Sequence, residues 1–164
     1  MKILVHDKMQ TNYVYLLSAP YGKVHNEEFN PYFSPQEMLE LGVFEGKYCN
    51  DCQEEYPSKW FENAKISDNP NVECNYFKIK SRQPLSIWKE KGWINEHDPR
   101  GWFQWYCRYW LGRRIEGYDD WQIKRWRAFS RHAGAIRKNC IPNDANCRPK
   151  QRQALLQWSH NPFI

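Results

Sequence analysis

The sequence has no long run of apolar residues, and its mean hydropathy is low, at −0.92. A membrane-spanning helix needs about 20 consecutive, mostly apolar residues, so no membrane partner is expected. The first apolar stretch, residues 3–5, is interrupted by His6, Asp7 and Lys8, and it is too short for the apolar region of a signal peptide. We therefore expect an intracellular protein, cytoplasmic or nuclear, that is a monomer.

The motifs of the common enzyme classes are also absent. The chain has no P-loop, no glycine-rich dinucleotide turn, no zinc-protease helix motif, no serine-hydrolase elbow and no zinc-deaminase signature. The patterns of zinc fingers, homeodomains and RNA-recognition motifs are missing too. These absences exclude most familiar kinases, dehydrogenases, metalloproteases and deaminases, and any chemistry is expected to use no cofactor.

Cysteines are few, and they do not form a complete metal-binding pattern. Cys49 and Cys52 have the spacing of half a zinc site. Cys140 and Cys147 are spaced too widely to be the second half, and no histidine follows at ligand spacing. Without a signal peptide, we expect all six cysteines to be reduced thiols, packed as small hydrophobic side chains, in place of disulfides or zinc ligands.

Aromatic residues are abundant: the 164 residues include nine Trp, ten Tyr and eight Phe. Disordered chains are poor in such rings, and each ring buries a large apolar area. A chain of this length is the usual size of one domain. We expect a single compact domain, residues 1–164, whose core is built mainly from rings.

Charge is divided unequally along the chain. Residues 1–80 have eight Lys and Arg against twelve Asp and Glu, a net charge of −4, and residues 81–164 have sixteen against seven, a net charge of +9. All eleven arginines lie at Arg82 or later, and the planar guanidinium group suits phosphate. The asymmetry favours an anionic partner, and we expect nucleic acid, DNA in particular.

Capping residues and periodicity predict a mainly α (α+β) fold of about six helices with one or two short N-terminal strands. Residues 11–17 are expected to form a strand because they are rich in β-branched and aromatic side chains, and the alternating residues 76–80 a second one. Helices are expected from Ser34 to Gly42, from Pro57 over Trp60 and Phe61, from Pro84 to Gly92, from Asp98 to Gly112, from Asp119 or Asp120 to about Lys138, and from Arg148 over Trp158.

The helix expected at Asp98 has the clearest pattern. Asp98 should cap it, with Pro99 as its first residue. Most of its positions are aromatic, and Arg100, Gln104 and Arg108 form one narrow polar stripe. A helix that is apolar on nearly every side is normally buried. We expect this helix at the centre of the core, with its polar stripe facing a cleft or solvent.

Positive charge is concentrated on one side of the following helix. The cations opposite its apolar face are Lys124, Arg127, Arg131 and Lys138. A solvated face is one interpretation, but four cations without interleaved carboxylates repel one another, which favours an anionic partner. In the last helix, Arg152 and Gln153 are expected to point outward.

One candidate catalytic residue is Asp98, because arginines follow it closely and could hold an anion beside it. Its carboxylate could act as a general base or position water, and the alternative is a capping role alone. Gly101 could allow a backbone or a ligand to approach closely. The residues expected to bind phosphate are Arg100, Gln104, Arg108, Arg113, Arg114, Lys124, Arg127, Arg131 and Lys138.

A second candidate segment is the glycine-led turn 46–52. Lys47 could act as an amine nucleophile and Asp51 as a base, and the alternative is a surface turn with an ordinary ion pair. Trp102, Tyr106 and Tyr48 are the candidates for stacking on a base. The two segments must meet in space if they form one site.

Several stretches of the sequence resemble a known family. They are ELGVFEGKYCNDC, NYFKIKSRQPLSIWKEKGWINEHDPRGWFQWYCRYWLGRR, QIKRWRAFSRH and NCIPNDANCRPKQRQALLQW. The family is one of small, Trp-rich proteins that are widespread in bacteria and fungi, without an assigned activity. The resemblance covers about Ser34 to Trp158 and implies that Lys47 and Asp98 lie in characteristic motifs. Against the family's pattern, Glu45 stands where glycine is usual, and Cys49 is not a regular member.

The leading hypothesis is a metal-independent enzyme that removes a modified or damaged base from DNA, as a DNA glycosylase does. Such an enzyme needs an electropositive groove, rings that stack on a flipped base, and a carboxylate. One alternative is a non-catalytic nucleic-acid-binding module, whose affinity would fall with salt. Another is an enzyme acting on a small phosphorylated or nucleotide substrate, whose basic residues would gather in one deep pocket.

Overall fold

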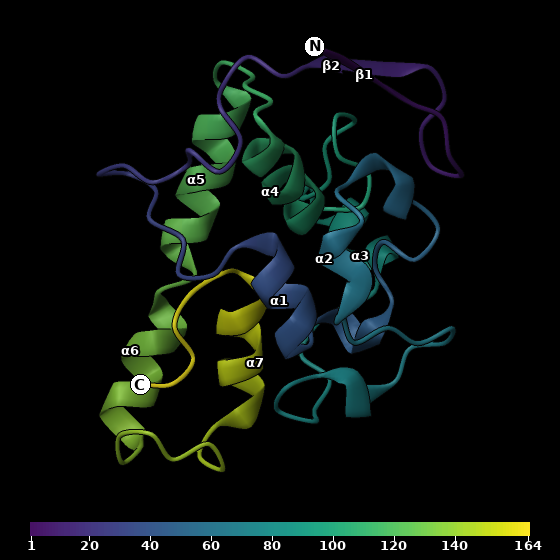
Figure 1. Ribbon diagram of the computed structural model, residues 1–164. Helices are drawn as coiled ribbons and strands as arrows, with labels where there is room; N and C mark the ends of the chain where they lie inside the picture. Colours follow the sequence, from purple (N-terminus) through teal and green to yellow (C-terminus); the bar gives the residue numbers. More distant parts are fainter.

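The computed structural model describes residues Met1 to Ile164, and its elements are mainly helices with one small sheet, which confirms the expected fold class (Figure 1). The strands are β1 (Lys2–Val5) and β2 (Tyr13–Leu16). The helices are α1 (Pro35–Leu41), α2 (Lys59–Glu62), α3 (Leu85–Glu90), α4 (Trp102–Leu111), α5 (Tyr118–Ala128), α6 (Arg131–Asn139) and α7 (Pro149–Gln157). Three 3-10 turns, η1 (Phe44–Gly46), η2 (Gln53–Glu55) and η3 (Val72–Cys74), lie between them.

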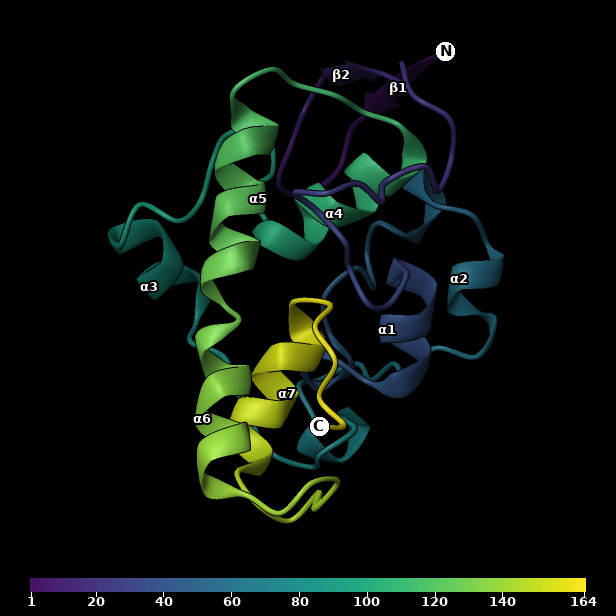
Figure 2. The same ribbon diagram turned by 90° about the vertical axis from the view of Figure 1, so that its left-hand side faces the viewer.

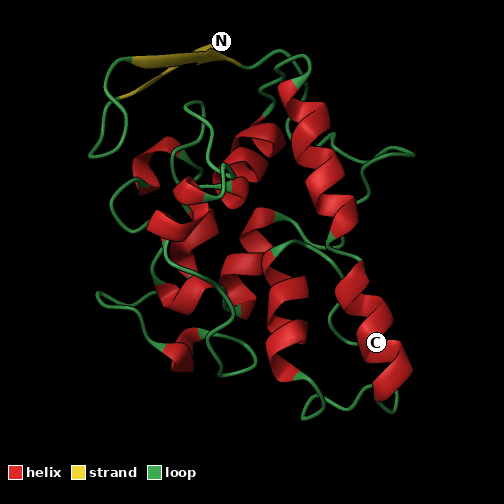
Figure 3. Ribbon diagram, turned by 180° about the vertical axis from the view of Figure 1, so that it is seen from behind, coloured by secondary structure: helices red, strands yellow, loops and turns green.

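The two strands pair as an antiparallel hairpin at one end of the domain (Figure 3). The strand expected over residues 11–17 is confirmed at its centre, β2. Its alternation places Tyr15 against the domain, on the same face as the buried Val5 of β1, whereas Leu4 and Val14 face solvent. The hairpin therefore covers the core on one face only.

The second strand expected, over residues 76–80, is wrong, because this segment turns back on itself. The Lys78 N–H donates to the Asn75 carbonyl at 3.1 Å. The Asn75 side chain donates to the Ile79 carbonyl at 2.8 Å. Lys78 also has a positive φ of 56°. Local side-chain bonds of this kind compete with strand pairing, and here they prevail.

Most of the expected helix starts are confirmed, and α1 shows why. The Glu37 N–H donates to the Ser34 hydroxyl at 3.1 Å, and the Ser34 N–H donates to the Glu37 carboxylate at 2.9 Å. This capping box fixes the first turn, and the helix ends at Gly42 as expected. Starts near Pro57, Pro84 and Pro149 are also where α2, α3 and α7 begin.

The start of α4 differs from the expectation. Gly101 precedes the first helical residue, and Asp98 does not cap the helix. The Gln104 side chain accepts from the Arg100 N–H at 2.9 Å and so supplies the bond that the cap was expected to make. Gly101 has a φ of 108°, and a Cβ there would lie 3.0 Å from the Trp88 ring. Glycine is therefore required at this position.

Helix α4 forms the centre of the core, as expected. Its rings Trp105 and Tyr106 are fully buried, and rings from the rest of the chain, such as Phe29 and Trp60, pack in the same core. The polar stripe is buried too: Arg108 has no exposed surface. The expectation that the stripe faces a cleft or solvent is wrong, because carboxylates from distant segments pair with it.

The long helix expected up to about Lys138 is divided into α5 and α6, which meet at a bend (Figure 2). At the junction the backbone bonds shorten to the 3-10 pattern: Ser130 N–H donates to the Arg127 carbonyl at 3.2 Å, and His132 N–H to the Phe129 carbonyl at 3.1 Å. Gly117, and not an aspartate, precedes α5. The Asp119 carboxylate accepts from the Ile115 N–H at 2.7 Å.

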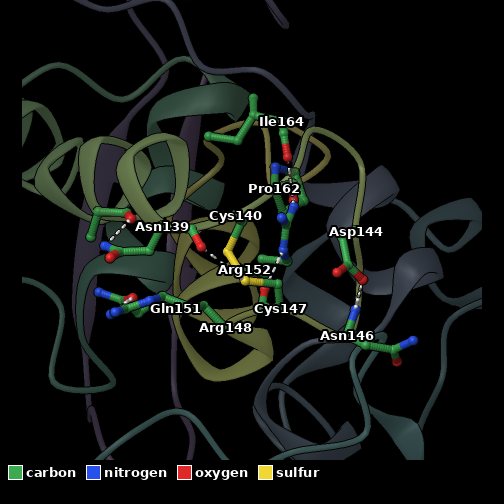
Figure 4. The surroundings of a disulfide bond; sticks show 11 residues. Asn139, Cys140, Asp144, Asn146, Cys147, Arg148, Gln151, Arg152, Pro162 and Ile164 are labelled. Carbon is green, nitrogen blue, oxygen red and sulfur yellow. Dashed lines mark hydrogen bonds between the residues drawn. A yellow bond between two sulfur atoms is a disulfide. The ribbon is translucent and has the colours of Figure 1, made fainter.

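Helix α7 turns back along α6, and its burial corrects one expectation. Arg152 and Gln153 are buried and do not point outward. Arg152 donates to the backbone carbonyls of Cys147 and Pro162, both at 2.8 Å (Figure 4). Backbone oxygens of the chain around α7 therefore accept the hydrogen bonds of this buried side chain.

A disulfide between Cys140 and Cys147 closes the loop from α6 to α7 (Figure 4). The expectation of reduced thiols throughout is wrong for this pair. Because α6 ends at Asn139 and α7 begins at Pro149, the two chain segments run close together, and the Cα atoms are 5.9 Å apart, within the range that a disulfide needs. The other four cysteines are free, and three of them are buried.

Candidate functional site

The carboxylate of Asp98 is the centre of a buried group of charges. It accepts from Arg113 at 2.5 and 3.0 Å, from Arg108 at 3.0 Å and from the Tyr118 hydroxyl at 2.7 Å. Burial alone would lower the pKa of Arg113, but the adjacent Asp98 charge outweighs it and raises that pKa. We call Asp98, Arg108, Arg113, Tyr118 and Glu55 the Asp98 cluster.

Glu55 completes this cluster from another part of the chain. Its carboxylate accepts from Arg108 at 2.7 and 3.0 Å, and the Tyr15 hydroxyl donates to it at 2.6 Å. Two carboxylates thus neutralise two guanidinium groups in the interior. Such pairs are costly to break, because the remaining charge would be buried alone. The cluster joins the hairpin, η2 and α4, and the oxygens of both carboxylates accept from arginine and tyrosine donors.

The second candidate segment lies beside the first, as one site would require. Asp51 accepts from Arg100 at 2.8 and 3.2 Å, and the Tyr48 hydroxyl donates to the Arg100 carbonyl. The hydrogen bond from Arg100 lowers the pKa of Asp51, which weakens Asp51 as a base. Lys47 is exposed and makes no ion pair. The turn therefore contains an ordinary ion pair, between Asp51 and Arg100, as the alternative interpretation of this segment expected.

A pocket of about 400 Å³ opens on another side of α4, between α3, the junction of α5 and α6, and α7. This volume lies within the range of small-molecule sites. In Figure 2, α3 stands apart on the far side of α5 and so forms the outer wall. Eight rings line the pocket: Phe44, Tyr48, Trp88, Trp93, Trp102, Phe103, Phe129 and Trp158. We call it the aromatic pocket.

Two rings of the pocket, Trp102 and Phe129, stack on Trp158. Its ring centroid lies 4.6 Å from that of Trp102 and 4.3 Å from that of Phe129, and both pairs are nearly parallel. The Trp102 indole N–H donates to the Gln122 carbonyl at 3.2 Å, which fixes the ring at the pocket floor. These stacked faces are therefore occupied by one another, and the rings left for a flat ligand are Trp88 and Trp93, which pair with no other ring.

Cations line the aromatic pocket, and no carboxylate does. Arg82, Arg125, Arg131 and Lys150 contribute to its wall. Among these four, only Arg82 has an ion pair, at 3.1 Å from Glu45, which lies outside the lining. Uncompensated positive charge in a concave, low-dielectric site attracts anions strongly. The pocket therefore combines stacking surfaces with a positive potential.

A histidine in the wall is neutral at physiological pH. Burial, and then the charge of Arg131, lower the pKa of His132. Its Nδ1 lies 3.2 Å from the side-chain nitrogen of Gln151. The amide nitrogen can only donate, so Nδ1 accepts this hydrogen bond and Nε2 carries the proton of the neutral ring. A neutral imidazole whose Nδ1 is released can act as a general base, and no other histidine lines the pocket.

A chain of hydrogen bonds connects the Asp98 cluster with the aromatic pocket. The Tyr118 hydroxyl donates to Asp98 and accepts from the Gln122 side chain at 3.0 Å. The side-chain oxygen of Gln122 then accepts from Arg125 at 2.8 Å. The paired charges of the cluster therefore orient an unpaired cation of the pocket.

The expected site residues are divided among three environments. Of the stacking candidates, Trp102 and Tyr48 line the pocket, whereas Tyr106 is buried and donates to the Phe33 carbonyl at 2.5 Å. Of the phosphate-binding candidates, Arg131 lines the pocket. Those that are buried or held inside are Arg100, Gln104, Arg108 and Arg113; Arg114 lies over the Tyr109 ring; Lys124, Arg127 and Lys138 are exposed.

Sequence reasoning missed Arg125, Trp88, Trp158 and His132. The signal for Arg125 was present: it follows Trp121 by four residues, so the two side chains share a helix face, and its guanidinium lies 4.7 Å from that ring. Trp158 had been assigned to the core of the last helix. No local pattern indicates that it is shared between the core and the pocket.

The chain matches no protein-family model, and it matches neither a curated protein nor a solved structure. The family resemblance therefore stays a prediction, although Glu45 bears on it: its φ is 54°, a conformation that glycine favours. No helix is both long and apolar enough to cross a membrane. No three His, Cys, Asp or Glu side chains are arranged to hold a metal ion.

Proposed function

We propose that this protein binds nucleic acid and takes one unstacked base into the aromatic pocket. The observation that carries the proposal is the composition of the pocket, which has eight rings, four cations and no carboxylate. Bases stack on aromatic side chains with about 1–3 kcal/mol each, whatever the sequence. Phosphates need cations, which the same wall provides.

Exposed cations near the pocket extend the proposed surface. Lys124, Arg127 and Lys138 are exposed on α5 and α6, and none of them forms an ion pair. They would contact the phosphates that flank the bound base. In this proposal the protein is a monomer, because one copy supplies all of the rings and cations named here.

Removal of the bound base is the second candidate function, and His132 is the observation that favours it. A glycosylase must activate water or stabilise the sugar cation. Asp98 was the expected base, but its oxygens are occupied by two arginines and Tyr118. In the pocket, neutral His132 takes that role in the proposal once a water molecule replaces the Gln151 amide at Nδ1, and Asp98 orients Arg125 through Tyr118 and Gln122.

Binding is tested by fluorescence anisotropy with three labelled DNAs: a single strand, a matched duplex and a duplex with one mismatched pair. The single strand and the mismatch should bind more tightly than the matched duplex, because extracting a base from them costs less. Lys150→Gln should weaken binding severalfold, and Lys59→Gln, an exposed cation of α2 outside the pocket, should not. Equal affinity for all three DNAs, or equal loss in both variants, would contradict the proposal.

Excision is tested with duplexes that contain modified bases, followed by alkali and denaturing electrophoresis. Base release that is lost in His132→Gln, with binding retained, supports the enzyme. Binding of DNA without release of a base would indicate a nucleic-acid-binding module without catalytic activity. If neither occurs, the pocket is assigned to small phosphorylated ligands.

The proposed location inside the cell has its own test. Disulfides are rare in reducing compartments, so the Cys140–Cys147 bond argues against the cytoplasm or nucleus. Alkylation of free thiols in freshly lysed cells, followed by mass spectrometry, should find both cysteines modified if the protein is intracellular. If they are protected, the proposed location is wrong.

A further inference from the structure

Arg125 differs from the carboxylate-paired arginines of the interior, and also from Arg152, which backbone carbonyls hold outside the pocket lining. Arg100, Arg108 and Arg113 each have a carboxylate partner, at 2.8, 2.7 and 2.5 Å. Arg125 is half-buried in the pocket wall and has none. An arginine that is withdrawn from water without a counterion is unfavourable, so its position needs an explanation beyond stability.

One edge of the Arg125 guanidinium is occupied and the other is free. Nη1 donates to the Gln122 side-chain oxygen at 2.8 Å and to the Trp93 carbonyl at 3.1 Å. Nε and Nη2 make no hydrogen bond, and neither is among the buried polar atoms that lack a partner, so both are open to solvent. Nε and Nη2 together form an edge of the fork that can bind an oxyanion with two parallel bonds.

The free edge is held in place by rings and by the hydrogen-bond chain. The guanidinium carbon lies 4.7 Å from the ring centre of Trp121 and 5.3 Å from that of Trp158. Gln122 is itself fixed by Tyr118. Burial lowers the pKa of Arg125 to about 10, so the group is still charged at neutral pH and gains from an anion at its edge. Such preorganisation reduces the entropy lost on binding.

From this geometry we infer that Arg125 is the phosphate receptor of the aromatic pocket, binding through Nε and Nη2 the phosphate of the nucleotide whose base stacks beside it. The inference rests on the proposed function, since it concerns the same pocket. It defines the ligand as a nucleotide unit, a flat base with an attached phosphate. Trp158 contacts the guanidinium, but its two faces lie against Trp102 and Phe129. The base would stack on Trp88 and Trp93, the two pocket rings that pair with no other ring.

The test measures quenching of tryptophan fluorescence by the four nucleosides, by their 5′-monophosphates and by inorganic phosphate. In the wild type, the monophosphates should bind about tenfold more tightly than the nucleosides, because bonds to charged groups are of this size. Arg125→Lys keeps the charge but loses the two-bond edge. It should reduce the affinity for monophosphates about tenfold and leave that for nucleosides unchanged.

The matched control is Arg137→Lys, an exposed arginine of α6 outside the pocket, which should change neither affinity. A second measurement needs no variant: phenylglyoxal should modify Arg125 in the wild type, and a monophosphate, but not a nucleoside, should protect it. Monophosphates that bind no better than nucleosides, or that leave Arg125 unprotected, would overturn the inference. If oligonucleotide binding still depends on Lys150 in that case, the proposed function stands alone. If oligonucleotides do not bind either, both fail.

Discussion

The Asp98 cluster and the aromatic pocket use the same kind of side chain in opposite ways. In the cluster, Arg108 and Arg113 meet two carboxylates and lie entirely in the interior. In the pocket, Arg125 meets a glutamine and a backbone carbonyl, and one edge stays free. An arginine stabilises the fold where its charge is paired, and it can serve a ligand where its charge is not.

The location of an arginine along the chain does not determine whether its charge is paired. Both groups of arginines lie in the basic half of the chain, and Tyr118 of the cluster is only four positions before Gln122, about one turn of α5. The cluster determines where Arg125 points. Removing a residue from one group should therefore give a different experimental result from removing a residue from the other.

The largest expected effect is that of Asp98→Asn on stability. The amide cannot neutralise Arg108 and Arg113, and breaking a buried pair in this way costs about 3–5 kcal/mol. Urea unfolding should show that loss in the free energy of unfolding. Arg125→Gln, the counterpart in the pocket, should change the same quantity by less than about 1 kcal/mol while it removes phosphate binding.

If the two substitutions prove equally destabilising, the division between paired and unpaired arginines is wrong. The stability of each variant also determines how a loss of its activity is interpreted. Loss of any activity in Asp98→Asn cannot by itself assign catalysis to Asp98, because the fold and the orientation of Arg125 change together. The free energy of unfolding must be measured on the same protein.

A smaller effect is expected from reduction of the Cys140–Cys147 disulfide. A closed loop of this length stabilises by about 2.5 kcal/mol through the entropy of the unfolded chain. Reduction should lower the stability by about that amount, and amide exchange should rise in α6 and α7 but not in α4. A uniform rise, including α4, would mean that the two regions do not unfold separately.

The smallest effect is the dependence of stability on pH through His132 and His160. Burial lowers the pKa of both, so the folded state favours the neutral rings. Below pH about 6.5 the unfolded chain binds more protons than the folded one, and the stability should fall as the pH is lowered. His132→Gln should flatten part of this slope. A stability that rises between pH 7 and pH 5 would contradict it.

Local rules predicted much of the fold, because the relevant bonds are local. The capping box of Ser34 and Glu37 closes within one turn, and Pro35 begins the helix next to it. The ring-rich segment after Gly101 was predicted to be the core helix, because its polar stripe is too narrow to form a solvent-facing side. The absence of a cap at Asp98 was not predictable. The Asp98 carboxylate pairs with Arg113 instead, and a helix pattern does not encode that contact.

The site was less predictable, because its parts come from distant segments. Asp51 lies beside Arg100, 49 residues away, and no spacing rule predicts this contact; the sequence required only that the two segments meet if they form one site. Trp88, Arg125 and Trp158 become one wall only after α3, α5 and α7 have packed. Periodicity identified which residues of each helix point together, and packing determined which faces meet a cavity.

The bend between α5 and α6 separates the two halves of one pocket wall. Arg125 precedes it and Arg131 follows it, and 3-10 turns inside a helix often mark hinges. A continuous helix would hold the two cations at one fixed spacing. With the joint between them, the backbone torsions of Phe129 and Ser130 set that spacing instead.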